Sequence, residues 1–366
     1  MSNARIILGC GLSGLATAIT LASNGERVKI LEKSKSGGSK FPESIHAFRN
    51  YSSAVDELDL IRSRNFSINN MKPIHKIIKF GPSLNPAEMY SRDKPIFYAV
   101  KRGNIKESID NQLIKQAESL QVDFEFNTKG NCKNADIIAS GSTFATEIGY
   151  GRHYKNVDVD EDTIIFFLND DYAPKGYAYA IPYGKHEISV VTTSFDPLSF
   201  NKMSILFNSL VKNIPIFSGL LKNAEVGPEF AKIGFSFLPQ TAKVKKMLLV
   251  GEAAGFSEAD RGFGMHYALE SGFLAAKSLI EGLDYDTLWK ASFEEELIKA
   301  FKRRLFLNKI GNNQYDQLIN SGSRTSTEEY LKYKQNQGSK SEVDINIEIK
   351  NLRTKFDITK IFEKGN

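Results

Sequence analysis

The sequence is poor in the residues that build metal clusters and disulfide scaffolds. Its 366 residues include two cysteines, Cys10 and Cys132, and five histidines that are far apart in the chain. There is no CxxC pair and no pair of histidines at helical spacing. These absences argue against a disulfide framework, a zinc cluster and a dithiol redox enzyme, and no metal is expected.

Long apolar runs and blocks of like charge are also missing. No apolar stretch reaches the roughly 18 residues that span a bilayer, and glycines interrupt the apolar start of the chain, which therefore does not read as a secretory signal. The net charge of +5 is mild, and nucleic acid is not expected as a partner. With 41% hydrophobic and 25% charged residues, the composition is that of a soluble, cytoplasmic protein.

A glycine-rich loop stands near the start of the chain. Residues 5–8 read as a short strand, GCGLSG follows at 9–14, and a helical segment leads to a second strand over 28–31. This strand, turn, helix and strand order is the context in which GxGxxG binds a dinucleotide. The pattern predicts such a site but does not distinguish NAD from FAD.

Each glycine of this loop has a physical role. Gly9 permits the sharp turn, Gly11 lets a pyrophosphate approach the backbone, and Gly14 lets the helix pack closely on the sheet. The helix N-terminus faces the phosphate charge, and Glu32 ends the second strand where a carboxylate binds ribose hydroxyls. The same unit contributes the candidate cofactor-binding residues Leu12, Ser13 and Lys33.

A second glycine-rich stretch, VGEAAGFSEADRGFG, occupies residues 250–264, between an apolar strand and a long helix predicted to begin at about Met265. It is not a GxGxxG and no second strand–helix–strand unit follows it. Its acid Glu252 can accept hydrogen bonds from a ribityl chain. Its RGFGM turn can offer backbone N–H groups to a flavin's pyrimidine edge.

VGEAAGF…GFGMHYALESGFLAA resembles the second flavin motif of the FAD-dependent monooxygenase and geranylgeranyl reductase superfamily, whose fold is like that of para-hydroxybenzoate hydroxylase. The resemblance implies that this stretch binds the flavin end of an FAD whose pyrophosphate lies at the first glycine-rich loop. FYAVKRGNIKESIDNQLIKQA (97–117) and NADIIASGS (134–142) are similar to two further segments of the family. The cofactor-binding residues implied, together with one from the loop before residue 48, are Gly251, Glu252, Gly262, Gly264, Met265, Arg102, Gly141 and Ser44.

The late stretch also departs from the family pattern. Glu252 replaces the usual aspartate, Ala259 the usual proline, and Phe263 the glutamate of GEGI. These changes alter the loop beside the flavin.

The segment YAPKGYAYAIPYGKHEISVV (172–191) resembles the substrate-pocket motif of geranylgeranyl reductases. Its matching residues are the candidate substrate-binding residues Pro174, Tyr177, Tyr179, Ile181 and Pro182. The alternation in YAYAI predicts a strand with the tyrosines and the isoleucine on one face and alanines on the other. An aromatic and aliphatic face suits a long hydrocarbon, although an ordinary core strand shows the same pattern.

Reductases of this family commonly carry a cysteine after the second strand. Here GGSKFPESIHAF (37–48) contains none, and Glu43, Ser44 and His46 are available in its place. The candidate catalytic residues are Tyr177, Tyr179 and His46, with His266 a further candidate proton donor.

The expected fold is α/β, with a Rossmann-type FAD-binding domain, an antiparallel-sheet substrate domain and C-terminal helices. We assign 1–45, 96–150 and 240–282 to the first domain, 46–95 and 151–239 to the second, and 283–366 to a C-terminal helical region. EELIKAFKRRLFLNKI (295–310) carries a basic cluster, which suits either packing on the nucleotide domain or peripheral contact with an anionic membrane.

The resemblance implies a reductase in which FAD delivers hydride from its N5 to an isolated C=C bond of an isoprenoid lipid, geranylgeranyl or polyprenyl. Electrons would come from NAD(P)H or ferredoxin, since no second Rossmann unit is evident. Two alternatives remain, an FAD-dependent aromatic monooxygenase and a flavin- or lipid-binding protein without turnover.

Overall fold

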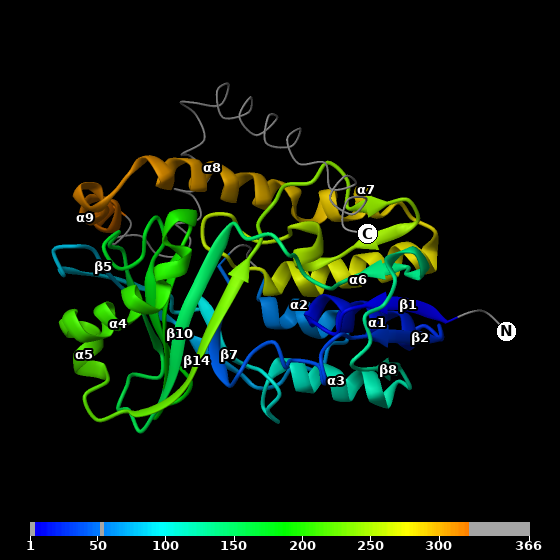
Figure 1. Ribbon diagram of the computed structural model, residues 1–366, viewed down its shortest axis with the longest axis horizontal. Coiled ribbons are helices and arrows are strands. Elements are labelled where there is room, and N and C mark those ends of the chain that lie inside the picture. Colours follow the sequence, from blue (N-terminus) through cyan, green and yellow to red (C-terminus); the bar gives the residue numbers. More distant parts are fainter. Residues whose placement is uncertain (1–3, 52–54, 322–366) are drawn as a thin grey trace.

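The computed structural model describes residues 4–51 and 55–321, which form three sheets flanked by helices (Figure 1). The first sheet is parallel except for β15 at its edge. In spatial order its strands are β15 (Lys243–Val244), β16 (Met247–Leu249), β9 (Ile137–Ile138), β1 (Arg5–Leu8), β2 (Val28–Leu31) and β8 (Asp123–Glu125).

The second sheet is antiparallel apart from one parallel pairing, between β11 and β5. Its order is β14 (Glu225–Gly234), β10 (Glu147–Lys155), β13 (Glu187–Ser194), β12 (Ala178–Pro182), β11 (Thr163–Phe167), β5 (Lys76–Phe80) and β6 (Pro86–Tyr90). Segments 46–95 and 151–239 therefore share one sheet, and the domain boundary proposed at residue 150 falls inside β10.

A small antiparallel sheet joins these two parts, with the order β3 (Ser44–Arg49), β7 (Phe97–Arg102) and β4 (Met71–Ile74). The helices of the first half are α1 (Leu12–Ser23), α2 (Glu57–Ser63), α3 (Ile109–Ser119) and the short η1 (Cys132–Asn134). Those of the second half are η2 (Pro197–Lys202), α4 (Met203–Asn213), α5 (Pro215–Leu220), η3 (Gly251–Ala254), α6 (Met265–Glu281), α7 (Tyr285–Trp289), the π-turn η4 (Lys290–Glu294), α8 (Glu295–Lys309) and α9 (Asn312–Ser321).

Helix α6 runs alongside α1 in Figure 1, and the two pack closely because both contribute small residues at the contact. A Cβ on Gly272 would lie 2.4 Å from the carbonyl oxygen of Ser13, so a larger residue would force the helices apart. Helix α1 is buried along its length from Leu12 to Leu21. The predicted fold class is confirmed.

Helix α8 uses part of its basic cluster internally. Arg303 pairs with Asp260, and the buried guanidinium of Arg304 lies 4.5 Å from the centre of the Phe195 ring. These contacts favour packing over membrane contact for these two arginines. Within the described part of the chain, no helix combines the length and apolarity needed to cross a bilayer. The part of the predicted C-terminal helical region beyond residue 321 lies outside the described residues.

Candidate functional site

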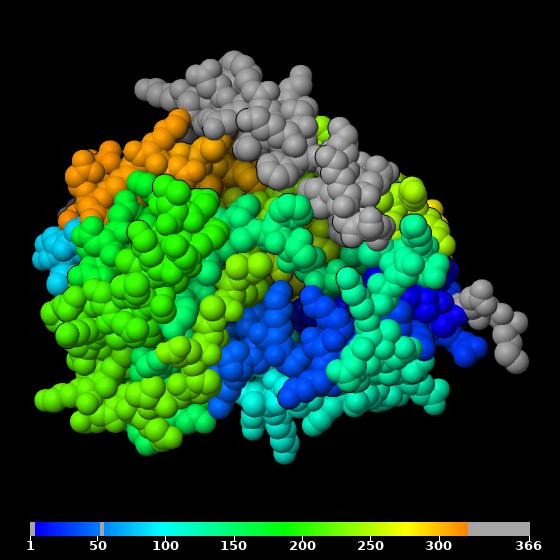
Figure 2. All heavy atoms as spheres, viewed as in Figure 1, coloured from blue at the N-terminus to red at the C-terminus, as the bar shows by residue number. Residues whose placement is uncertain are grey.

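The glycine-rich loops meet at one edge of the parallel sheet. Strands β1, β9 and β16 all point their carboxyl ends to this edge, because they are mutually parallel. The loops after them line a cleft of about 590 Å³, a size typical of ligand pockets. Figure 2 shows the surface hollowed where blue N-terminal residues lie beside the green and teal residues that follow them.

The first loop has the shape needed for a close backbone approach. Gly9 has φ +107°, and a Cβ there would lie 2.4 Å from the carbonyl oxygen of Ala139. A Cβ on Gly14 would lie 2.1 Å from the carbonyl oxygen of Gly9. Gly11, in contrast, faces open space, with nothing within 4 Å of a Cβ. The backbone at Gly11, at the N-terminus of α1, is therefore the point that an anionic group can reach.

Glu32 stands across the loop from α1. Its carboxylate accepts hydrogen bonds from the backbone N–H groups of Cys10 and Ser34, both at 2.8 Å. These bonds fix the carboxylate at the cleft wall and leave lone pairs for a diol. Cys10 lines the cleft as well, but burial raises the pKa of its thiol, and the nearby Glu32 charge adds to the shift. The thiol is thus kept protonated and unreactive.

The late loop closes the opposite side. Glu252 accepts a hydrogen bond from the Phe235 N–H at 3.2 Å and lies 3.8 Å from the Lys40 ammonium. The turn that follows is tied by the Gly262 N–H donating to the Glu258 carbonyl at 2.7 Å and the Glu258 N–H donating to that of Phe263 at 3.1 Å. This turn presents Gly262–Gly264 to the cleft immediately before α6.

Most of the predicted site residues come together. Those that line the cleft are Gly9, Gly11, Leu12, Ser13, Glu32, Lys33, His46, Arg102, Gly141, Tyr177, Tyr179, Glu252, Gly262, Gly264 and Met265. The predicted residues outside its lining are Gly14, Ser44, Gly251, Pro174, Ile181 and Pro182. Gly14 and Gly251 instead allow close packing, against Gly9 and Ser13 respectively. Whether each lining residue contacts a cofactor or substrate stays a prediction.

The tyrosine face predicted from the alternation is present. Tyr177, Tyr179 and Ile181 belong to one apolar cluster, while Ala178 and Ala180 belong to another on the opposite face of β12. Ile181 is fully buried in its cluster and lies outside the cleft lining. The two tyrosine rings lie 5.9 Å apart, each also against Phe166. Burial raises the pKa of both hydroxyls.

Tyr177 also ties the aromatic face to the late loop, since its hydroxyl donates to the Arg261 carbonyl at 2.5 Å. We expect Tyr177→Phe to lower the free energy of unfolding by about 0.5–1.5 kcal/mol and to weaken flavin binding several-fold, as the loop is less well held. Chemical unfolding and flavin titration measure the two effects. Tyr179→Phe is the matched control because it leaves this bond intact, and equal effects of the two variants would contradict the assignment.

His46 and Arg102 both line the cleft. Burial, with the Arg102 and Lys232 charges, holds the pKa of His46 well below its ordinary value, so the ring is neutral near pH 7. Its Nε2 lies 3.0 Å from the Ser44 hydroxyl. Arg102 makes a two-point ion pair with Asp110, at 2.7 and 2.9 Å. Two of the N–H groups of Arg102 that could bind a cofactor are therefore already bonded to Asp110.

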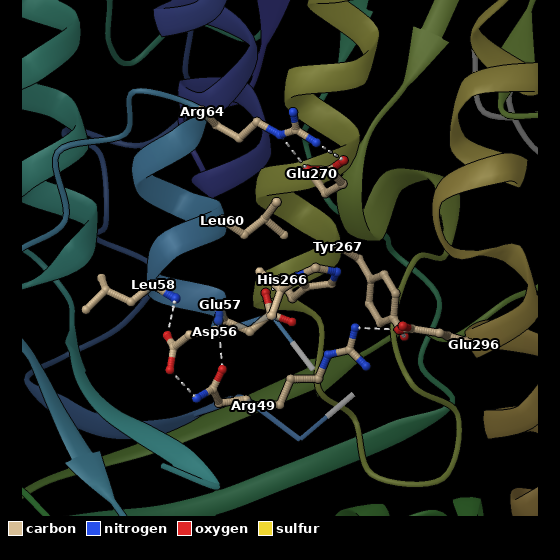
Figure 3. Close-up of polar contacts among 12 residues, drawn as sticks. Arg49, Asp56, Glu57, Leu58, Leu60, Arg64, His266, Tyr267, Glu270 and Glu296 are labelled. Carbon is tan, nitrogen blue, oxygen red and sulfur yellow. Dashed lines mark hydrogen bonds and ion pairs between the residues drawn. The ribbon is translucent and has the colours of Figure 1, made fainter. Parts of the chain in front are cut away.

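A buried ionic network lies behind the late loop (Figure 3). Arg49, which is 2% exposed, pairs with Glu258 at 2.6 Å and Glu296 at 2.7 Å, and its guanidinium lies 4.5 Å from the centre of the Tyr267 ring. The other oxygen of Glu258 accepts a hydrogen bond from the Tyr51 hydroxyl at 2.9 Å. Because Glu258 opens the Gly262–Gly264 turn, this network fixes the turn's position.

The first turn of α6 has a second clamp. His266 Nδ1 lies 2.6 Å from the buried Glu57 carboxylate, and Arg64 pairs with Glu270 one turn further on, at 3.0 Å (Figure 3). Both contacts join α2 to α6. His266 lies outside the cleft lining, so its geometry suits a structural part rather than the proton-donor role considered from the sequence.

Three potential metal-ligating side chains, Glu43, His153 and Glu187, also gather in the described part of the chain. Two lysines already neutralise them, since Lys101 lies 2.8 Å from Glu187 and Lys155 lies 3.2 Å from Glu43. We interpret the group as an ion-pair cluster.

Comparison with solved structures shows which proteins share this fold. A geranylgeranyl bacteriochlorophyll reductase-like protein of Thermoplasma acidophilum matches 95% of this chain and 98% of its own, with TM-score 0.72 and 18% identity. A flavin-dependent brominase matches 86% of this chain and 92% of its own, with TM-score 0.60 and 17% identity. At this identity the matches show that the chain shares the fold of these two proteins. No family model matches the chain.

Two curated proteins match part of this chain in sequence. A digeranylgeranylglycerophospholipid reductase of Methanosphaerula palustris is 28% identical over 182 residues, 45% of this chain and 43% of the relative. An uncharacterized protein of Methanocaldococcus jannaschii is 29% identical over 190 residues, 48% of this chain and 46% of the relative. The chain spans less than half the length of these curated relatives. Its resemblance to the geranylgeranyl reductase family of FAD flavoproteins is confirmed at this modest identity.

Proposed function

We propose that the protein is an FAD-dependent oxidoreductase that reduces isolated C=C bonds in the isoprenoid chain of a lipid. The observation that carries the proposal is the convergence in one cleft of both glycine-rich loops and the Tyr177–Tyr179 face. The glycine-rich loops suit a dinucleotide, and the tyrosine face suits an apolar chain. The relatives named as reductases of geranylgeranyl lipids support the substrate class.

Three features of the cleft support FAD as its cofactor. The open backbone at Gly11 would hold the pyrophosphate, Glu32 the ribose hydroxyls, and Glu252 the ribityl hydroxyls. The N–H groups of the Gly262–Gly264 turn would face the pyrimidine edge. Bound and reduced, FAD supplies the hydride for the reaction.

The protein's own part is to position the alkene and exclude water. Isolated alkenes are poor hydride acceptors, so close positioning in a dry site has to provide much of the rate. The buried tyrosines and Phe166 offer an apolar wall, against which each CH₂ of a chain contributes about 0.8 kcal/mol to binding. Phe263, in place of the family's usual glutamate, packs on Phe97 and adds to this apolar surface.

The test begins with the purified protein and its flavin absorbance. We would reduce the flavin with dithionite without oxygen, add a geranylgeranyl phospholipid, and follow reoxidation together with the mass of the lipid. Reoxidation with a gain of two hydrogens per bond is the expected result. NAD(P)H and reduced ferredoxin, tried in place of dithionite, identify the electron donor.

A flavin that stays reduced with every polyprenyl lipid would overturn the proposal. If it then forms a hydroperoxide spectrum with oxygen and consumes NAD(P)H on addition of an aromatic compound, the protein is a monooxygenase. Tight flavin binding with neither reaction would indicate a binding protein without turnover.

A further inference from the structure

Glu147, the first residue of β10, places a carboxyl group in the wall of the cleft. Its side chain accepts hydrogen bonds from the Ser236 hydroxyl at 3.0 Å and from the hydroxyl of Thr146. The residue is 6% exposed. A Cβ on Gly262 would lie 3.8 Å from Glu147 Oε1, so the carboxyl group adjoins the turn assigned to the flavin.

The charges facing Glu147 come from three directions. Glu252 adds negative charge from the late loop, Lys232 adds positive charge from β14, and Arg304 lies on the side of α8. Burial outweighs the two hydroxyl hydrogen bonds and raises the pKa of Glu147 to about 7, with the Glu252 charge adding to the rise. The group can therefore exchange a proton near neutrality.

The other titratable groups of the cleft suit that task less well. The lowered pKa of His46 keeps its ring neutral near pH 7, so no imidazolium is present to donate a proton. Burial raises the pKa of Tyr177 and Tyr179, and the Tyr177 proton is held by the Arg261 carbonyl. Burial lowers the pKa of Lys232, which is therefore a rival candidate for the acid.

We propose that Glu147 is the acid that protonates the double bond during its reduction. The inference rests on the proposed function. The O–H bond of the carboxyl group breaks and a C–H bond forms at one alkene carbon, while the neighbouring carbon receives hydride from reduced flavin. The two electrons come from the reduced flavin, and the Glu147 carboxylate regains its proton from solvent after turnover.

The experiment compares wild type with Glu147→Gln, which keeps the size of the side chain and an oxygen for Ser236. In wild type we expect the single-turnover rate of flavin reoxidation by geranylgeranyl phospholipid to fall about tenfold per pH unit above the midpoint near 7. The variant should lose at least 100-fold at pH 6, on the order of a general acid's contribution, and lose this pH dependence. Lys232→Met should keep the pH profile but move its midpoint to higher pH, because it removes a positive charge that lowers the Glu147 pKa.

A readout without turnover uses the oxidised holoprotein. Ionisation of a carboxyl group beside the flavin should shift its visible absorption with a midpoint near pH 7, and Glu147→Gln should abolish the shift. Ser236→Ala removes a hydrogen bond that favours the carboxylate, so it should move the midpoint of both profiles to higher pH. This second variant tests the assignment even if Glu147→Gln folds poorly.

The outcomes separate the two proposals. Wild type that reduces the lipid, with Glu147→Gln equally fast and equally pH-dependent, overturns the role of Glu147 alone. Loss of the pH profile in Lys232→Met instead assigns the proton to Lys232. Wild type that reduces no isoprenoid lipid overturns the proposed function and this inference with it, even where the absorption titration is present.

Discussion

Replacing Arg49 with methionine is expected to lower the free energy of unfolding by about 3–5 kcal/mol, the range for breaking a buried ion pair from one side. The reason is the environment of Glu258, whose side chain is 2% exposed and would lose the guanidinium 2.6 Å away. The same change should release the Gly262–Gly264 turn and weaken flavin binding. Denaturant unfolding of the flavin-free protein and flavin titration measure both effects.

Two further variants sharpen this test. Arg62→Met removes the same kind of side chain from an exposed pair with Asp59, 3.6 Å apart, and should change the free energy of unfolding by less than about 0.5 kcal/mol. Arg49→Met combined with Glu258→Gln removes the stranded charge and should recover part of the loss. If Arg49→Met is no worse than Arg62→Met, the network does not hold the loop.

Gly11→Ala is expected to leave the fold intact and to weaken flavin binding. Nothing lies within 4 Å of a Cβ at this position in the flavin-free chain, so the added methyl group meets no protein atom. It would occupy the space through which the pyrophosphate reaches the backbone. We expect a loss of about 10- to 100-fold in affinity, corresponding to the roughly 1–3 kcal/mol of an overpacked contact. Flavin titration measures the loss.

Gly14→Ala, three residues further on, should show the opposite division of effects. Its Cβ would lie 2.1 Å from the Gly9 carbonyl oxygen, so the helix must shift away from the loop and the unfolding midpoint should fall even without flavin. A Gly11→Ala protein that binds flavin as tightly as wild type would show that the cofactor does not approach this turn. The pair thus separates contact with the cofactor from packing of the fold.

The parts of the fold that were predictable from sequence are those with local signatures. The first strand, the second strand and the start of α6 at Met265 follow from apolar runs bounded by glycines, and the structure places them at those residues. The alternation over 177–181 likewise fixed which residues share a face of β12. Each of these signals is contained within about ten neighbouring residues.

What the sequence could not provide are pairings across long separations. Arg49 and Glu258 are 209 residues apart, and Arg49 and Glu296 are 247 apart. In a local window each reads as an ordinary surface charge. Glu147 was missed for the same reason, because its burial depends on Ser236 and Gly262. The sequence does hold one local signal for this network, the two acids of SEAD (257–260). Two carboxylates within a loop of small residues require partners if that loop is buried.

The strand order of the parallel sheet also governs when the cofactor can be captured. Residues 7–8 pair with 137–138, which in turn pair with 248–249, and the second half of the cleft follows at 252–264. During synthesis the GxGxxG loop is complete more than two hundred residues before its counterpart exists. The proposed flavin site is therefore complete only after residue 264 has been synthesised, and until then β9 lacks its sheet partner β16.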